Sequence, residues 1–245
     1  MIVSDSKKFV CFRPWKCAST TLTKRLRAYD NGKFPASPTE YEGFEGKLSK
    51  HSWTIENFLK LPESQLGYFS FVFLRNPYDR AYSGFLQRKQ RVAKINPEGG
   101  EFKAIEKGFQ SFLEFWLKRF EDRGQVIGNL MNEYVEYEGR RWVDYVGHLE
   151  TFESDLNEVF EKLGVNSDSQ GEKKPNANVR ASVDTLSSDG RENASYRYLD
   201  EYTQETVSLV NHLAARDFKS TDYRKIEPAE IEALQRAGVK PTPFA

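Results

Sequence analysis

An almost continuous apolar run at residues 68–74, Tyr-Phe-Ser-Phe-Val-Phe-Leu, constrains the fold of this chain more than any other feature. A run of this kind predicts a strand buried on both faces, as in a parallel sheet. Asn76 and Pro77 follow it and predict the start of a helix, because asparagine caps a first turn and proline fits its first position. The segment therefore predicts a central strand, a short loop with Arg75, and a helix.

A second strand, loop and helix are predicted near the N-terminus. Phe9–Phe12 is a short apolar run that ends at Arg13 and Pro14. Three apolar residues then recur at helical spacing: Leu22, Leu26 and Tyr29. Hydroxyl side chains, which suit exposed N–H groups, stand where this helix begins: Ser19, Thr20 and Thr21.

The remaining pattern alternates between strands and helices. Helices are predicted at residues 53–61, 109–120, 126–137, 151–163, 203–218 and 228–237, and a strand at residues 142–146. Polar composition predicts loops at residues 30–50, 92–108 and 166–195. We therefore expect an α/β fold with a central, mainly parallel sheet flanked by helices. One domain is expected over residues 1–225, followed by a tail at 226–245 with a short packing helix.

Composition excludes several classes of protein. The chain carries 36 basic and 36 acidic residues, and this balance disfavours a wide nucleic-acid-binding surface. No apolar stretch approaches the length of a membrane span, and the first residues lack a signal-peptide core, so we expect a cytoplasmic protein without membrane contact. The two cysteines, Cys11 and Cys17, predict one buried thiol and one loop thiol. Oligomeric state stays open.

The loop at residues 13–21 is predicted to bind an anion. Lys16 and the hydroxyls lie between a strand and the N-terminus of a helix, where free N–H groups and a partial positive charge favour a phosphate. The loop contains no glycine, and Lys16 precedes the hydroxyls by three residues, so it does not match the loop of nucleotide kinases. An ordinary capped helix with a surface lysine is the alternative.

Two motifs resemble those of sulfotransferases that use 3′-phosphoadenosine 5′-phosphosulfate (PAPS). Residues 13–21 resemble the family's 5′-phosphosulfate loop, Pro-Lys-x-x-x-Thr-Ser, with Trp15 in place of the proline. Residues 73–85 resemble its 3′-phosphate motif, Val-Arg-x-Pro-x-x-Arg-x-x-Ser. Residues 143–156, 198–203 and 216–218 resemble blocks of the carbohydrate (type 2) branch, so that the resemblance runs over residues 8–223.

The resemblance implies a P-loop-like three-layer fold and PAPS as co-substrate, with no metal. The acceptor would be a hydroxyl of a carbohydrate or of a small metabolite. Lys16 would hold the phosphosulfate and act in catalysis, and further donor-binding residues would be Cys17, Ala18, Ser19, Thr20, Thr21, Arg75, Ser83 and Arg180. Arg180 and Lys174 lie in a basic loop and would contact the donor or an anionic acceptor. The alternative is that this loop is a solvated surface loop without a binding role. Arg80 is expected to be structural and to pair with Asp79 or Asp144.

A base must take the proton of the acceptor hydroxyl. We assign this role to His51, because a histidine pKa near neutrality suits proton transfer and related bacterial chains carry Lys-His at this place. The alternatives are a helix-capping or substrate-orienting role for His51, with Glu56 or a carboxylate of residues 92–108 as base. His148 and His212 are expected to be structural.

Two other functions remain open from the sequence. One is a nucleotide or small-molecule kinase, which the missing glycines disfavour. The other is a catalytically inactive protein of the same fold, which the joint presence of Lys16, His51, Arg75 and Ser83 disfavours.

Overall fold

The computed structural model describes residues 1–26, 29, 54–59, 63–124, 130–165 and 198–238. The chain divides into two compact units. The first unit comprises Met1–Arg75 and Gly128–Val179, and the second comprises Asn76–Ile127 and Arg180–Ala245. The expected single domain over residues 1–225 stays a prediction.

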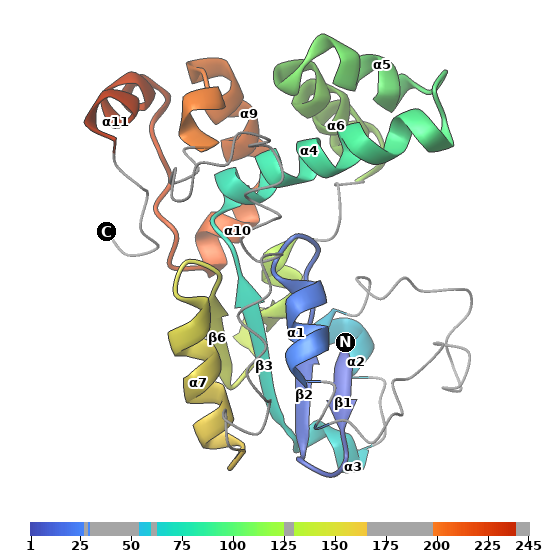
Figure 1. Ribbon diagram of the computed structural model, residues 1–245, viewed down its shortest axis with the longest axis vertical. Coiled ribbons are helices and arrows are strands. Elements are labelled where there is room, and N and C mark those ends of the chain that lie inside the picture. The colour runs from blue at the N-terminus through green and yellow to red at the C-terminus, as the bar shows by residue number, and fades with distance from the viewer. Residues whose placement is uncertain (27–28, 30–53, 60–62, 125–129, 166–197, 239–245) are drawn as a thin grey trace, which may run out of the picture. The chain divides into compact units, whose positions relative to one another are not determined.

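A four-stranded mixed sheet forms the centre of the first unit (Figure 1). Its strands, in spatial order, are β1 (Ile2–Ser4), β2 (Phe9–Phe12), β3 (Phe69–Leu74) and β6 (Tyr145–His148). The last three run parallel, and β1 pairs antiparallel with β2. Five of the six residues of β3 are buried, which confirms it as the central strand.

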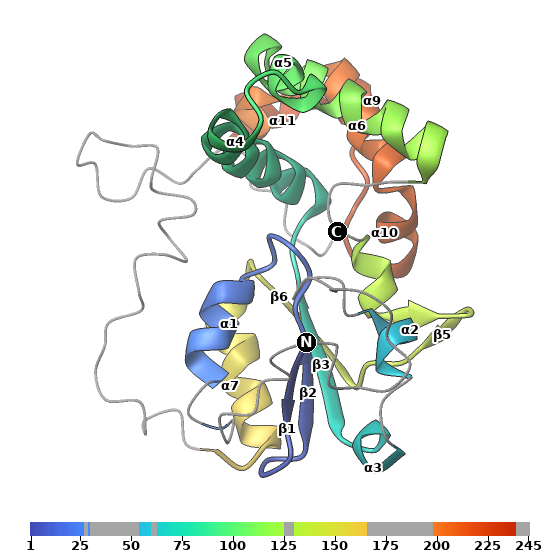
Figure 2. The ribbon, with the colours of Figure 1, turned by 90° about the vertical axis from the view of Figure 1, so that its right-hand side faces the viewer.

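Helices lie on both faces of this sheet, as Figure 2 shows. One face packs against α1 (Ser19–Leu26) and α7 (Phe152–Lys162), with Phe71 and Phe73 in the shared core. On the other face, the ring of Phe58 in α2 (Ile55–Phe58) meets the ring of Phe12 edge-on. A further short helix, α3 (Glu63–Leu66), precedes β3. These observations confirm an α/β fold with a sheet flanked by helices.

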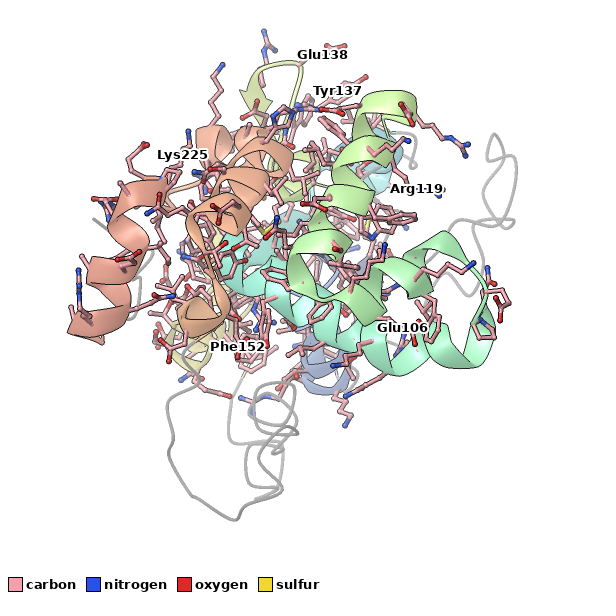
Figure 3. The ribbon with its side chains drawn as sticks, turned by 90° about the horizontal axis from the view of Figure 1, so that it is seen from above. Glu106, Arg119, Tyr137, Glu138, Phe152 and Lys225 are labelled. Carbon is pink, nitrogen blue, oxygen red and sulfur yellow. The ribbon has the colours of Figure 1, made fainter. Side chains whose placement is uncertain are left out.

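The prediction of a helix at residues 126–137 is wrong. Within the described part, this segment contains a 3₁₀ helix, η3 (Met131–Tyr134), and then the hairpin strands β4 (Glu136–Tyr137) and β5 (Arg140–Arg141). Figure 3 labels Tyr137 and Glu138 at this hairpin. Glu138 and Gly139 have φ values of 50° and 73°, which a two-residue hairpin turn requires and a helix does not allow.

The strand predicted at residues 142–146 is shifted toward the C-terminus. β6 begins at Tyr145, directly after Asp144. The carboxylate of Asp144 accepts hydrogen bonds from both the backbone N–H and the hydroxyl of Ser70, at 2.7 and 2.8 Å. Asp144 therefore anchors the start of β6 against the start of β3.

The second unit is helical in the part of it that the structure describes. It contains α4 (Pro77–Ile95), α5 (Gly100–Lys107), α6 (Phe109–Arg123), η5 (Tyr198–Glu201), α9 (Gln204–Leu213), α10 (Ala215–Ser220), η6 (Pro228–Glu230) and α11 (Ile231–Ala237). Asn76 caps α4 by accepting from the Tyr78 N–H, and Pro77 is its first residue, as predicted. The helices predicted at 109–120 and 228–237 are confirmed here, and the one predicted at 151–163 is confirmed as α7 of the first unit.

Two predictions for this unit are wrong. Residues 92–108 are not a loop, because α4 continues to Ile95 and α5 follows; Ile105 packs into the core while Lys103, Glu106 and Lys107 are exposed. The helix predicted at residues 203–218 is broken at Ala214, whose φ and ψ of −105° and 18° leave the helical region and separate α9 from α10.

Tyr78 organises a buried hydrogen-bond network at the start of α4. Its hydroxyl donates to Asn211 Oδ1 and accepts from the Ile226 N–H, and the Asn211 amide donates to the Ile226 carbonyl. Tyr202 donates to the Tyr78 carbonyl at 2.7 Å. Burial raises the pKa of Tyr78, so that its hydroxyl keeps its proton across the physiological range.

No helix in the described ranges is long and apolar enough to cross a membrane.

We predict that Gly147→Ala destabilises the first unit by about 1–3 kcal/mol. Gly147 of β6 is paired with Phe73 of β3, and an added Cβ would lie only 2.7 Å from the Phe73 ring. That ring also packs against Phe152, with centroids 5.0 Å apart, so it has little room to move. Urea unfolding measures the loss; Gly67→Ala is the control, because a Cβ there meets no atom within 4 Å. Equal stabilities of the two variants would contradict the prediction.

We also predict that Tyr78→Phe lowers the free energy of unfolding by about 1–3 kcal/mol, because the Ile226 N–H and Asn211 Oδ1 lose their buried partner. The matched control is Tyr145→Phe. The Tyr145 hydroxyl donates to the exposed Glu158, and water can take its place as the donor in the variant. Thermal and urea unfolding of both variants tests this, and a larger loss in Tyr145→Phe would refute it.

Candidate functional site

Parallel pairing brings two predicted anion-binding segments to one edge of the sheet. Phe12 of β2 is in register with Val72 of β3, so the carboxyl ends of both strands lie side by side. Residues 13–18 continue from β2, and Arg75 continues from β3. The Arg75 guanidinium donates through Nη1 to the Lys16 carbonyl at 3.2 Å. Lys16 and Arg75, which are 59 positions apart in sequence, are therefore neighbours.

The loop adopts a left-handed conformation at two residues that are not glycine. Lys16 has a φ of 66° and Ala18 a φ of 54°. A residue with a side chain pays about 1–2 kcal/mol for such a conformation, and strain of this kind gathers at functional sites. Alternation of left- and right-handed residues turns successive N–H groups to one side and forms a concave anion site. The loop thus achieves without glycine the backbone shape that glycine normally supplies.

Helix α1 presents its N-terminus at the end of this loop. Ala18 precedes the helix and has no side-chain acceptor, so it cannot cap it. Among the described residues, the N–H groups of Ser19 and Thr20 have no backbone acceptor, as expected in a first helical turn. The first turn contains no acidic residue. The hydroxyls of the first turn, predicted to cap the helix, are instead inside it, where they and the N–H groups suit an anion.

Arg13 stabilises the loop at its N-terminal end, directly after β2. This residue is buried and donates through Nη1 to the Thr23 hydroxyl at 2.6 Å and through Nη2 to the Met1 carbonyl at 3.1 Å. Thr23 in turn donates to the Ser19 carbonyl at 2.7 Å. Burial lowers the pKa of the Arg13 guanidinium from its usual high value. Arg13 therefore links the start of β1 to the first turn of α1.

Both cysteines are buried thiols. Cys17, in the loop, is fully buried and its thiol lies 3.8 Å from the sulfur of Met131. Cys11 lies in β2, where burial raises its pKa to about 12. The prediction of one buried thiol is confirmed for Cys11, but the loop thiol of Cys17 is buried as well and anchors the loop to η3.

Ser83 belongs to the second unit, where it is buried on α4 two turns after the Asn76 cap. Arg80, one turn earlier, forms an ion pair with Asp217 of α10 at 3.5 Å. Both side chains of this pair are buried, which confirms a structural role for Arg80. The sequence prediction named Asp79 or Asp144 as the partner; Asp144 is instead bound to Ser70.

The predicted base, His51, and the predicted donor ligand Arg180, with its neighbour Lys174, lie outside the described residues. Of the alternative bases, Glu56 is exposed on α2, and Glu101 of the 92–108 segment is committed to an ion pair with Arg88. These roles stay predictions.

The other two histidines have separate surroundings. His148 ends β6 and is buried, with Nδ1 3.7 Å from the Asp155 carboxylate, which also accepts from the His148 N–H at 2.7 Å. His212 is exposed on α9 beside the ring of Phe120. Within the described ranges, no group of three or more His, Cys, Asp or Glu side chains could hold a metal ion.

Sequence reasoning missed two features of this site. The left-handed conformations of Lys16 and Ala18 could not be predicted from the sequence, since glycine is the residue that normally indicates them. The hydrogen bond from Arg13 to Thr23 was also not predicted. An arginine directly after a buried strand was the signal that could have indicated it.

Comparison with known proteins bears on the identity of the chain. A family model described as the sulfotransferase family matches residues 1–224, which is nearly the whole sequence. Searches of curated proteins and of solved structures found no match. The family match covers both the loop after β2 and the segment after β3, and it agrees with the resemblance on which the motifs were interpreted. The chain therefore belongs to the sulfotransferase family.

Proposed function

We propose that the chain transfers a sulfuryl group from PAPS to a hydroxyl of a carbohydrate or of a small metabolite. The observation that carries this proposal is the contact between Arg75 and the Lys16 carbonyl, because it joins an anion-receiving loop to a second cationic group. Two cationic groups that follow different strands suit a ligand with two separate phosphates, and one nucleotide can carry both. A 3′,5′-bisphosphate has this distribution of charge.

The two segments would divide the donor between them. The backbone of residues 16–20 and the hydroxyls of Ser19, Thr20 and Thr21 would hold the 5′-phosphate, with the dipole of α1 favouring its charge. Arg75 would bind the 3′-phosphate with a forked guanidinium contact, and Ser83 would add a hydroxyl. Arg180 would contribute a further cation.

Lys16 would act on the leaving group. In sulfuryl transfer the acceptor oxygen forms a bond to sulfur while the bond from sulfur to the bridging phosphate oxygen breaks. Negative charge then grows on the bridging oxygen, where the Lys16 ammonium stabilises it. His51 would take the proton of the acceptor hydroxyl. Positioning and electrostatics supply the rate acceleration, because the protein forms no covalent bond in this scheme.

We predict that adenosine 3′,5′-bisphosphate, the product of the donor, raises the melting temperature of the chain and that ATP with Mg²⁺ does not. A ligand at 100 times its Kd stabilises a protein by about 2.7 kcal/mol, which a thermal-shift assay detects. Stabilisation by ATP with Mg²⁺ alone would favour a kinase. Stabilisation by the bisphosphate without any transfer to hydroxyl acceptors would favour an inactive binding protein.

We predict that Lys16→Ala lowers the turnover of labelled PAPS by about 10²–10³-fold at saturating donor, since one electrostatic contact to the transition state is lost. The assay follows labelled product over a panel of sugar and small-molecule hydroxyls. Lys24→Ala is the matched control, because Lys24 is exposed on α1, the helix that follows the loop of Lys16. Wild-type turnover in Lys16→Ala would disprove the leaving-group role.

A further inference from the structure

We infer that Arg75 is a positioning residue for the catalytic loop as well as a ligand of the donor: it holds the Lys16 peptide in place even when no 3′-phosphate is bound. This inference rests on the proposed function for its ligands, but its structural basis is independent of them. It begins with the peptide group between Lys16 and Cys17.

This peptide group is held at both ends. Its carbonyl oxygen accepts from Arg75 Nη1 at 3.2 Å, and its N–H, that of Cys17, donates to the Pro14 carbonyl at 3.3 Å. Residues on both sides of the peptide group have constrained conformations, because Lys16 is left-handed and the Cys17 side chain is fully buried. The orientation of this one peptide group therefore constrains the backbone from which the Lys16 side chain extends.

The Arg75 side chain is itself fixed. It is among the largest fully buried side chains of the described residues, with 2% of its surface exposed, and it follows the central strand of the sheet directly. A guanidinium carries five N–H donors, so a bond to the Lys16 carbonyl is compatible with a contact to a phosphate. A buried charged donor on a carbonyl is also stronger than a neutral hydrogen bond. Arg75 can thus oppose the strain at Lys16.

A consequence distinguishes positioning from simple phosphate binding. If Arg75 only binds the 3′-phosphate, its loss should not affect a ligand that lacks this group. If it also shapes the loop, its loss should weaken the binding of a 5′-phosphate in the loop. Adenosine 5′-monophosphate (AMP) and adenosine 3′,5′-bisphosphate differ only in the 3′-phosphate, so the pair separates the two roles.

The test measures the affinity of both nucleotides for the full chain by calorimetry. We expect Arg75→Met to weaken the bisphosphate by about 100-fold and AMP by about tenfold, the latter corresponding to the loss of one charged hydrogen bond. Ser83→Ala should weaken the bisphosphate and leave AMP unchanged. Gly67→Ala, a change in the same unit at a position where an added Cβ meets no atom within 4 Å, should leave both affinities unchanged. AMP binding by Arg75→Met with wild-type affinity would overturn the inference.

Hydrogen exchange of the peptide that spans residues 13–18 gives a second readout without ligand. We expect exchange at the Cys17 amide to be about tenfold faster in Arg75→Met than in the wild-type chain or in Gly67→Ala, because only Arg75→Met frees the Lys16–Cys17 peptide group. Equal exchange would count against positioning. If the wild-type chain binds neither nucleotide, the proposed function fails while this readout still decides the positioning role. Should Arg75→Met not fold, Arg75→Lys keeps the charge, loses the geometry and serves in both measurements.

Discussion

The parallel pairing of β2 with β3 is the constraint on which the candidate site depends. Parallel strands end at the same edge of a sheet, so the loop after β2 and the residue after β3 have to meet there. The hydrogen bond from Arg75 to the Lys16 carbonyl is the direct result. An antiparallel arrangement of the same two strands would place these groups at opposite edges, and no shared anion site would form.

The loop itself is a strained structure that its surroundings stabilise. Lys16 and Ala18 adopt left-handed conformations that side chains disfavour, and three contacts compensate for them. Arg75 binds the Lys16 carbonyl, Cys17 is buried against Met131, and Arg13 ties the first turn of α1 to the start of β1 through Thr23. A loop rich in glycine reaches a similar shape without strain but is less rigid when empty. A preorganised loop loses less conformational entropy when a phosphate binds.

Several contacts within the second unit stabilise the start of α4. Asn76 caps the helix, Tyr78 binds Asn211 and Ile226, and Arg80 pairs with buried Asp217. These contacts fix the first two turns of the helix that carries Ser83. The motif from Arg75 to Ser83 thus contains structural residues between its two proposed ligands, and the motif's length reflects the anchoring of a helix as much as the binding of an anion.

The sequence by itself determined strands β2 and β3 with the helices that follow them, the cap of α4 and the family, because apolar runs, Asn-Pro pairs and motif spacing are local signals. It failed at residues 126–137 and at Ala214, where a hairpin turn and a helix break depend on backbone angles that composition does not reveal. Only the tertiary structure decided that Arg80 pairs with Asp217, that Cys17 is buried, and that Arg75 reaches the Lys16 peptide. Each of these contacts joins residues far apart in sequence, and the packing of the whole unit selects the partner.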